Sequence, residues 1–228
     1  MDIKKIQIFG PFNSGTNLIS LILDNCIDKN IIIDKQGHTL MWKHCIDVNC
    51  IERCINNHPK TLFICIYRPL QNWISSMKKK PYLIKCNNID QKCVFKLPAP
   101  NGKTIKMIGS IKQPQNYNNI IEIYNKYYKN YIYLINKYDR VIFMNYYDFI
   151  NKNKVEEYLK KKLLNFNLSL KKNHEIFSVL GQPAKENAVT CSEEALDKKE
   201  KCFNKINDNN KLIIKKNENA KIKNFFEE

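Results

Sequence analysis

The first 26 residues constrain the fold more than any other part of the chain. An apolar run at residues 3–9 leads into a loop with two glycines, Gly10 and Gly15, and an apolar segment follows at residues 18–26. This pattern predicts a strand at residues 3–9 and a helix from about residue 16 to 27, joined by a tight turn. The backbone N–H groups at the start of such a helix, together with the positive end of its dipole, bind anions. The segment therefore predicts a phosphate-binding loop in an α/β fold.

The loop resembles a Walker A motif in the spacing of its two glycines but differs at two key positions. Thr16 stands where that motif has its lysine, and Asn17 stands where it has the hydroxyl that holds Mg²⁺. Chemistry at a γ-phosphate depends on both groups. We therefore expect this loop to bind the phosphate of a nucleotide without a metal ion.

The rest of the chain alternates between strand and helix patterns. The expected strands are residues 31–34, 61–67 and 140–146, and the expected helices are residues 47–57, 71–79, 117–138 and 154–165. The run at residues 61–67 is apolar throughout, which is typical of a parallel strand that is buried on both faces. This alternation predicts an α/β fold of the P-loop NTPase-like kind, a three-layer α/β/α arrangement with a central, mainly parallel sheet.

The chain is expected to form one main domain at residues 1–180. Within it, residues 81–116 are rich in Pro, Asn and Lys and are expected to be irregular. Long loops of this kind often shape binding sites, so we expect this insertion to bind the substrate. Residues 181–228 form a polar, Lys-rich C-terminal segment in which a helix is predicted from Thr190.

The amino-acid composition excludes several classes of protein for this chain. A hydrophobic content of 43% excludes a wholly disordered chain. The N-terminal residues lack a signal-peptide pattern, and the apolar runs are shorter than the roughly 20 residues that span a bilayer, so we expect a soluble, cytoplasmic protein without a membrane span. The net charge of +16 suits an anionic ligand. Because the lysines are scattered and interleaved with acids, we do not expect a nucleic-acid partner, and the oligomeric state is not indicated.

Nine cysteines are present without a CxxC pair, and we expect them to be reduced, structural thiols. Cys50, Cys54 and His58 recur every four residues and would share one face of the predicted helix. Zinc sites usually draw their ligands from two segments. The spacing therefore favours a buried helix stripe over a zinc site.

Three further segments carry residues suited to an anionic ligand. Arg68 follows the strand at residues 61–67, at the strand end where α/β folds bind ligands, and Ser76 lies early in the next helix. Lys43 and His44 pair a cation with a base that titrates near neutral pH. The third segment, residues 146–149, ends the strand predicted at residues 140–146.

Together these segments resemble the sulfotransferase family, whose members use 3′-phosphoadenosine 5′-phosphosulfate (PAPS). The run from Asn13 to Asn17, Asn-Ser-Gly-Thr-Asn, resembles the 5′-phosphosulfate loop of the branch that has Trp-Lys-His downstream. Arg68 and Ser76, eight residues apart, resemble the 3′-phosphate motif. Residues 116–133 and 146–149 resemble two later segments of the family, so the resemblance spans about residues 3–165.

The resemblance implies transfer of a sulfuryl group from PAPS to a hydroxyl or amine, without a metal ion. It implies that the acceptor is a small molecule, a carbohydrate or a peptide. His44 is expected to act as the general base. Lys43 is expected to supply positive charge, because many members have a lysine where Asn13 stands. The residues expected to bind the cofactor are Asn13, Ser14, Gly15, Thr16, Asn17, Arg68, Ser76 and, in the segment 181–188, Lys185.

The residues leave two alternatives open. One is a divergent P-loop phosphotransferase, acting on a nucleotide or another small molecule, which would need a lysine from elsewhere and magnesium. The other is a catalytically degenerate module that binds a nucleotide or a nucleic acid without turnover.

Overall fold

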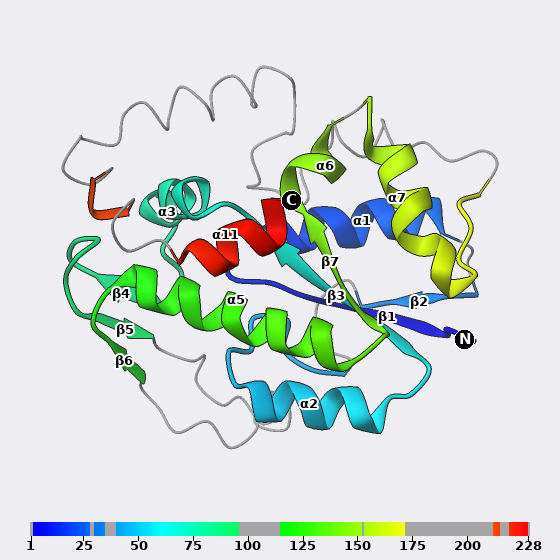
Figure 1. Ribbon diagram of the computed structural model, residues 1–228, viewed down its shortest axis with the longest axis horizontal. Helices are drawn as coiled ribbons and strands as arrows, with labels where there is room; N and C mark the ends of the chain where they lie inside the picture. Colours follow the sequence, from blue (N-terminus) through cyan, green and yellow to red (C-terminus); the bar gives the residue numbers. More distant parts are fainter. Residues whose placement is uncertain are drawn as a thin grey trace.

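The computed structural model describes residues 2–27, 30–34, 40–95, 115–151, 153–171, 212–214 and 219–227. Its central sheet contains β1 (Lys5–Phe9), β2 (Ile32–Ile33), β3 (Thr61–Tyr67) and β7 (Val141–Asn145). The strand order is β2-β1-β3-β7, and every pairing is parallel (Figure 1). The predicted α/β class with a parallel central sheet is therefore confirmed.

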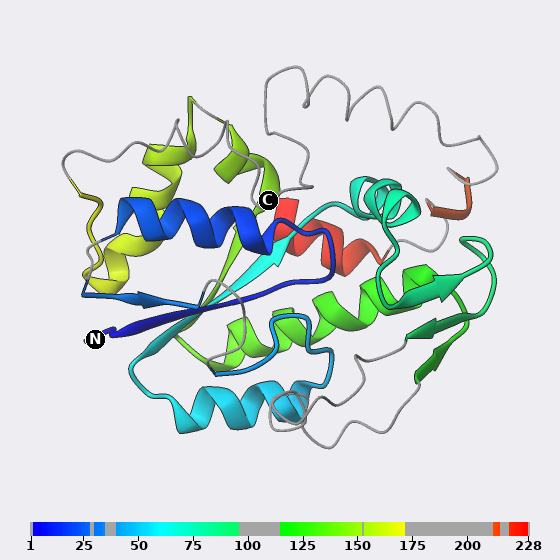
Figure 2. The same ribbon diagram turned by 180° about the vertical axis from the view of Figure 1, so that it is seen from behind.

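Helices cover both faces of this sheet (Figures 1 and 2). One face carries α1 (Thr16–Cys26), α6 (Tyr146–Ile150) and α7 (Val155–Leu163), which is continued by a 3₁₀ turn at Leu164–Phe166. The other face carries α2 (Val48–Asn57), α3 (Leu70–Lys79), α5 (Ile120–Lys137) and α11 (Ala220–Glu227).

The residues of β3 explain why its sequence is apolar throughout. Leu62, Ile64 and Ile66 belong to the core under α1 and α7. Phe63 and Cys65 belong to the core under α2 and α5. Since successive side chains of a strand point to opposite faces, both sets must be apolar when both faces are covered.

The segment expected to be irregular, residues 81–116, contains a second sheet. Its strands β4 (Ile84–Cys86), β5 (Cys93–Phe95) and β6 (Gln115–Tyr117) pair antiparallel in the order β4-β5-β6. The expectation was therefore wrong for these strands, because the pattern of each three-residue strand is too short to be read from the sequence. Residues 96–114 lie outside the described residues.

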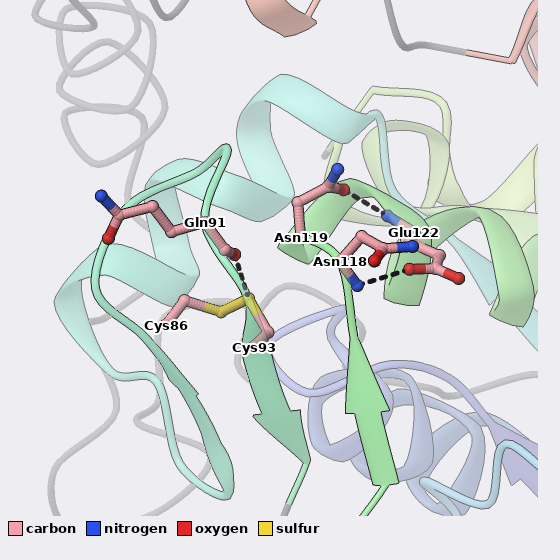
Figure 3. The surroundings of a disulfide bond; sticks show 6 residues. All are labelled: Cys86, Gln91, Cys93, Asn118, Asn119 and Glu122. Carbon is pink, nitrogen blue, oxygen red and sulfur yellow. Dashed lines mark hydrogen bonds between the residues drawn. A yellow bond between two sulfur atoms is a disulfide. The ribbon is translucent and has the colours of Figure 1, made fainter.

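A disulfide joins two strands of this small sheet (Figure 3). Cys86 and Cys93 are directly opposite each other in β4 and β5, with their Cα atoms 4.4 Å apart. The expectation of reduced thiols is wrong for this pair. Because cytosolic proteins rarely keep disulfides, the bond does not support the cytoplasmic location expected from the sequence. The other cysteines of the described residues are buried and form no disulfide: Cys26, Cys45, Cys50, Cys54 and Cys65.

A reciprocal cap sets the start of α5 (Figure 3). The Asn119 side chain accepts a hydrogen bond from the Glu122 N–H at 2.9 Å, and the Glu122 carboxylate accepts one from the Asn118 N–H at 2.6 Å. These bonds satisfy backbone donors that the first helical turn leaves unpaired. The helix begins three residues after its predicted start at residue 117, because residues 115–117 pair with β5 instead.

The C-terminal helix α11 packs on the main domain. Phe226 is buried and stacks on Tyr67 at the end of β3, with ring centroids 4.6 Å apart. The Tyr67 hydroxyl donates a hydrogen bond of 2.7 Å to the Glu227 carboxylate. The helix predicted from Thr190 lies outside the described residues. Among the described helices, none is both long and apolar enough to cross a membrane.

Candidate anion-binding site

The residues singled out from the sequence meet at the carboxyl ends of the central strands. The glycine loop follows β1, Arg68 follows β3 and Tyr146 follows β7, and parallel strands place these ends at one edge. The chain leaves β1 for β2 on one side and returns to β3 on the other. The site therefore lies at the point where the strand order reverses, which is where open α/β sheets bind ligands.

The loop between β1 and α1 is tightly packed. Gly15 has a φ of 95°, and a Cβ atom there would lie 2.7 Å from Cδ2 of Tyr146. A Cβ atom at Gly10 would collide with the Ser14 hydroxyl. That hydroxyl is buried and donates a hydrogen bond of 2.8 Å to the Pro11 carbonyl. The loop thus needs glycine at both positions, and the Ser14 hydroxyl stabilises its shape.

The start of α1 offers backbone donors. Its N-cap is Gly15, and within the described part of the chain no side chain caps the first turn, which begins at the buried Thr16. The first N–H groups of a helix have no partner inside the helix, and the dipole adds positive potential there. This end of α1 is suited to an anion.

Arg68 presents a buried cation to the loop. Its side chain is 5% exposed, and Nη1 donates a hydrogen bond to the backbone oxygen of Asn13. Its Nε atom is buried and has no hydrogen-bond partner among the described residues, nor does a described carboxylate pair with this guanidinium. An unsatisfied N–H of a buried charged group is costly, so the arrangement favours an anionic ligand.

Two tyrosines of α5 hold the backbone of Arg68. The Tyr124 hydroxyl donates to the Arg68 carbonyl at 3.0 Å. The Tyr128 hydroxyl accepts from the Arg68 N–H at 3.1 Å and donates to the Ile66 carbonyl at 3.3 Å. Sequence reasoning assigned these rings to core packing and missed their hydroxyls. The signal was present, because a buried tyrosine hydroxyl usually needs a hydrogen-bond partner.

A second cation lies against α1. Lys43 is 7% exposed, and its Nζ atom donates a hydrogen bond to the side-chain oxygen of Asn17, in the first turn of the helix. The Lys43 carbonyl accepts a hydrogen bond of 3.0 Å from the N–H of Gly10. The segment that carries Lys43 is therefore bonded to both ends of the loop.

His44 is attached to the same loop. Its Nδ1 atom lies 2.6 Å from the carbonyl oxygen of Gly10, and its ring packs on Phe12 with centroids 4.3 Å apart. Since a carbonyl oxygen only accepts, Nδ1 carries the proton in this contact and Nε2 is the basic nitrogen. The His44 carbonyl accepts a hydrogen bond of 2.7 Å from the Tyr127 hydroxyl.

Asn13 connects the loop to α3. Its backbone is left-handed, with a φ of 59°, and its side-chain nitrogen donates to the carbonyls of Ser76 at 3.3 Å and Lys80 at 2.9 Å. The amide is thus directed at the end of α3, while the backbone oxygen accepts the bond from Arg68. The Ser76 side chain is half-buried on this helix.

The structure therefore links nearly all of the predicted site residues. Hydrogen bonds and loop contacts join Asn13, Ser14, Gly15, Thr16, Asn17, Lys43, His44, Arg68 and the backbone of Ser76. Lys185 lies outside the described residues.

The cysteines of α2 form a buried stripe, as expected. Cys50 and Cys54 belong to the core, and the Nδ1 atom of His58 lies 2.8 Å from the carbonyl oxygen of Cys54. Across the described ranges there is no cluster of three or more His, Cys, Asp or Glu residues suited to a metal ion.

No protein-family model, curated protein or solved structure matches the chain. Its chemistry must therefore be inferred from the site itself. A tight loop, an uncapped helix start and two buried cations are the elements of a site for a phosphate or sulfate group.

Proposed function

We propose that the chain is a sulfotransferase that moves a sulfuryl group from PAPS to a hydroxyl or amine, with a P-loop-like fold. The observation that carries the proposal is Arg68, a buried guanidinium bonded to the loop whose Nε atom lacks a partner among the described residues. Lys43 supports it from the other side, through its bond to Asn17 in the first turn of α1.

The residues present fit such a cofactor. The first turn of α1 has no side-chain cap among the described residues, and the Nε atom of Arg68 is available for one further bond. In this proposal, residues 13–17 hold the 5′-phosphosulfate through the loop backbone and the start of α1. Arg68 and Ser76 hold the 3′-phosphate, as a guanidinium suits phosphate oxygens.

PAPS would supply the sulfuryl group and leave as adenosine 3′,5′-bisphosphate. The role proposed for His44 is to accept the acceptor's proton at Nε2, because Nδ1 is bonded to the Gly10 carbonyl. Lys43 stabilises negative charge that develops at the end of α1. The two buried cations, Arg68 and Lys43, take the place of the lysine and metal ion of a Walker A site, so the proposed transfer needs no metal.

The small sheet β4-β5-β6 indicates where the acceptor would bind. Phe95 of β5 and Tyr82, just before β4, pack on Phe12 of the loop with centroids 6.0 and 5.4 Å away. The same Phe12 ring contacts His44, the proposed base. The described residues 82–95 of the insertion therefore adjoin the base. We assign to the insertion at residues 81–116 the binding of a small-molecule, carbohydrate or peptide acceptor.

Calorimetry with adenosine 3′,5′-bisphosphate tests the cofactor assignment. The wild-type protein should bind the ligand equally with and without EDTA, and Arg68→Gln should weaken binding by roughly 10- to 100-fold. Arg140→Gln is a matched control, because its Nε atom is also buried without a described partner but it lies at the opposite end of the sheet. An absence of binding at saturating ligand would overturn the proposal. A preference for ATP with Mg²⁺ would favour the phosphotransferase alternative.

Turnover measurements test the chemistry. His44→Gln should lower the rate of transfer from PAPS by about 100-fold or more while keeping the affinity for the bisphosphate. Lys43→Met should show the same separation of rate from affinity. Full activity of His44→Gln would show that the base is wrongly assigned. Tight bisphosphate binding without turnover by the wild-type protein would favour the degenerate module.

A further inference from the structure

We propose that Tyr124, Tyr127 and Tyr128 are positioning residues, through which α5 aligns Arg68 with His44. The inference rests on the proposed function, in which Arg68 grips the 3′-phosphate and His44 is the base. All three tyrosines act through hydroxyl bonds to the backbone and none is proposed to touch the substrate.

Helix α5 first holds the backbone of Arg68. The sheet pairing of β3 with β7 ends at Tyr67 and Asn145, and α3 begins beyond Pro69. The backbone of Arg68 therefore lies between a strand and a helix, where neither supplies its partners. Tyr124 binds its carbonyl and Tyr128 binds its N–H. These bonds hold both backbone groups of Arg68, and the guanidinium then reaches the backbone oxygen of Asn13 from a fixed Cα position.

Helix α5 also holds the segment that carries His44. The Tyr127 hydroxyl donates to the His44 carbonyl, and the Asn130 side chain donates to the Ile46 carbonyl, each at 2.7 Å. These bonds hold the backbone on both sides of Cys45. The imidazole ring of His44 is bonded to the loop, through Nδ1 and the Gly10 carbonyl. The base is thus held between α5 and the loop.

One rigid helix connects these two segments. Residues 124, 127, 128 and 131 have the spacing i, i+3, i+4 and i+7, so their rings share one face of α5. The rings are almost fully buried, and burial raises the pKa of the Tyr127 and Tyr128 hydroxyls, which keeps them protonated as donors. A hydroxyl lost here leaves a backbone group buried without a partner.

Tyr131 provides a matched control on the same face. Its ring is fully buried and packs on Tyr127 and Tyr128, but its hydroxyl has no hydrogen-bond partner among the described residues. Tyr131→Phe therefore removes a hydroxyl of the same helix and the same depth without removing a bond to the site.

The test compares Tyr→Phe variants by calorimetry with adenosine 3′,5′-bisphosphate and by turnover of PAPS. Tyr124→Phe and Tyr128→Phe should each weaken bisphosphate affinity by about tenfold. Tyr127→Phe should lower kcat by about tenfold and leave that affinity within about twofold. Tyr131→Phe should change neither. Equal effects of all four variants on affinity and kcat would indicate general loosening and would overturn the proposal.

Amide hydrogen exchange gives a readout that needs no ligand. The Arg68 N–H should exchange about tenfold faster in Tyr128→Phe than in the wild-type protein, and at an unchanged rate in Tyr131→Phe. Unchanged exchange in Tyr128→Phe would overturn the positioning role. If the Arg68 N–H exchanges faster in Tyr128→Phe but the wild-type protein does not bind the bisphosphate, the result supports the alignment by α5 and rejects the proposed function.

Discussion

The guanidinium of Arg68 lies over the ring of Tyr146, with its central carbon 4.4 Å from the ring centroid. The same ring occupies the space that a side chain at Gly15 would need. Tyr146 follows β7, Arg68 follows β3 and Gly15 ends the loop after β1. A single aromatic ring therefore contacts residues that follow three different strands, and it lies beside Arg68 of the proposed cofactor site.

Replacement of this ring should weaken the site. Tyr146→Leu removes the aromatic face beneath the guanidinium, and we expect adenosine 3′,5′-bisphosphate to bind about fivefold more weakly, as a contact of this kind contributes about 1 kcal/mol. Tyr146→Phe keeps the face and should bind within about twofold of the wild type. Calorimetry measures both. Equal losses in the two variants would assign the effect to the hydroxyl.

Gly15→Ala should destabilise the protein by about 1–3 kcal/mol, because an alanine is strained at a φ of 95° and its Cβ would collide with Tyr146. Urea denaturation measures the loss. In a Tyr146→Leu background the collision is relieved, so the same substitution should cost less. An equal cost in both backgrounds would show that backbone strain alone is responsible.

Loss of the Cys86–Cys93 disulfide should destabilise the protein, because the bond closes a short loop in the unfolded chain. We expect the double variant Cys86→Ser/Cys93→Ser to lose about 2–3 kcal/mol. Denaturation of the wild-type protein with a reductant should give the same loss, while the reductant should leave the variant unchanged. A wild-type protein that is indifferent to reductant would contradict this contribution.

The acid limb of the stability profile should depend on Glu52. Its carboxylate accepts bonds from Lys137 at 2.6 Å and Tyr133 at 3.0 Å, and the Lys137 bond is the main cause that lowers the Glu52 pKa below its usual 4.5. A lowered folded-state pKa stabilises the fold above the unfolded value, and this contribution is lost as the pH falls through the folded value. Glu52→Gln should therefore be less stable than the wild type at neutral pH.

The difference between these two proteins should shrink as the pH falls below about 4.5. Urea denaturation at a series of pH values measures it. Glu157→Gln is the control, because Glu157 is exposed and forms no ion pair in the described part of the chain. A gap for Glu52→Gln that is constant with pH would contradict the ion-pair account.

Most of the secondary structure could be predicted because its signals are local. The strand expected at residues 61–67 is β3 with the same bounds, and the helix expected from about residue 16 begins at Thr16. Both are set by apolar periodicity and turn residues within a few positions. The predicted helix at residues 117–138 starts late, at Ile120, because residues 115–117 pair with β5, a partner about 20 residues away.

The positions of the candidate residues in the fold were predictable from the sequence, but their contacts were not. Arg68 could be placed because it ends a buried parallel strand, and residues 13–17 because they precede a helix. Asn13 was expected to bind the cofactor, whereas its side-chain amide donates hydrogen bonds to the carbonyls of Ser76 and Lys80. The bonds from Tyr124 and Tyr128 to Arg68 were not predicted, since a helical stripe of tyrosines is equally consistent with plain packing.

Periodicity and turn chemistry act over a few residues, so the chain itself dictates a glycine loop between a strand and a helix and a sheet strand buried on both faces. Contacts between distant segments are not set by local sequence, because they depend on how the helices pack on the sheet. The bond from Tyr67 to Glu227, the contact of Arg68 with Asn13, and the attachment of His44 to both Gly10 and Tyr127 exist only in the folded chain. The tertiary structure thus decides which side chains are held at the loop and which atoms remain available to a ligand.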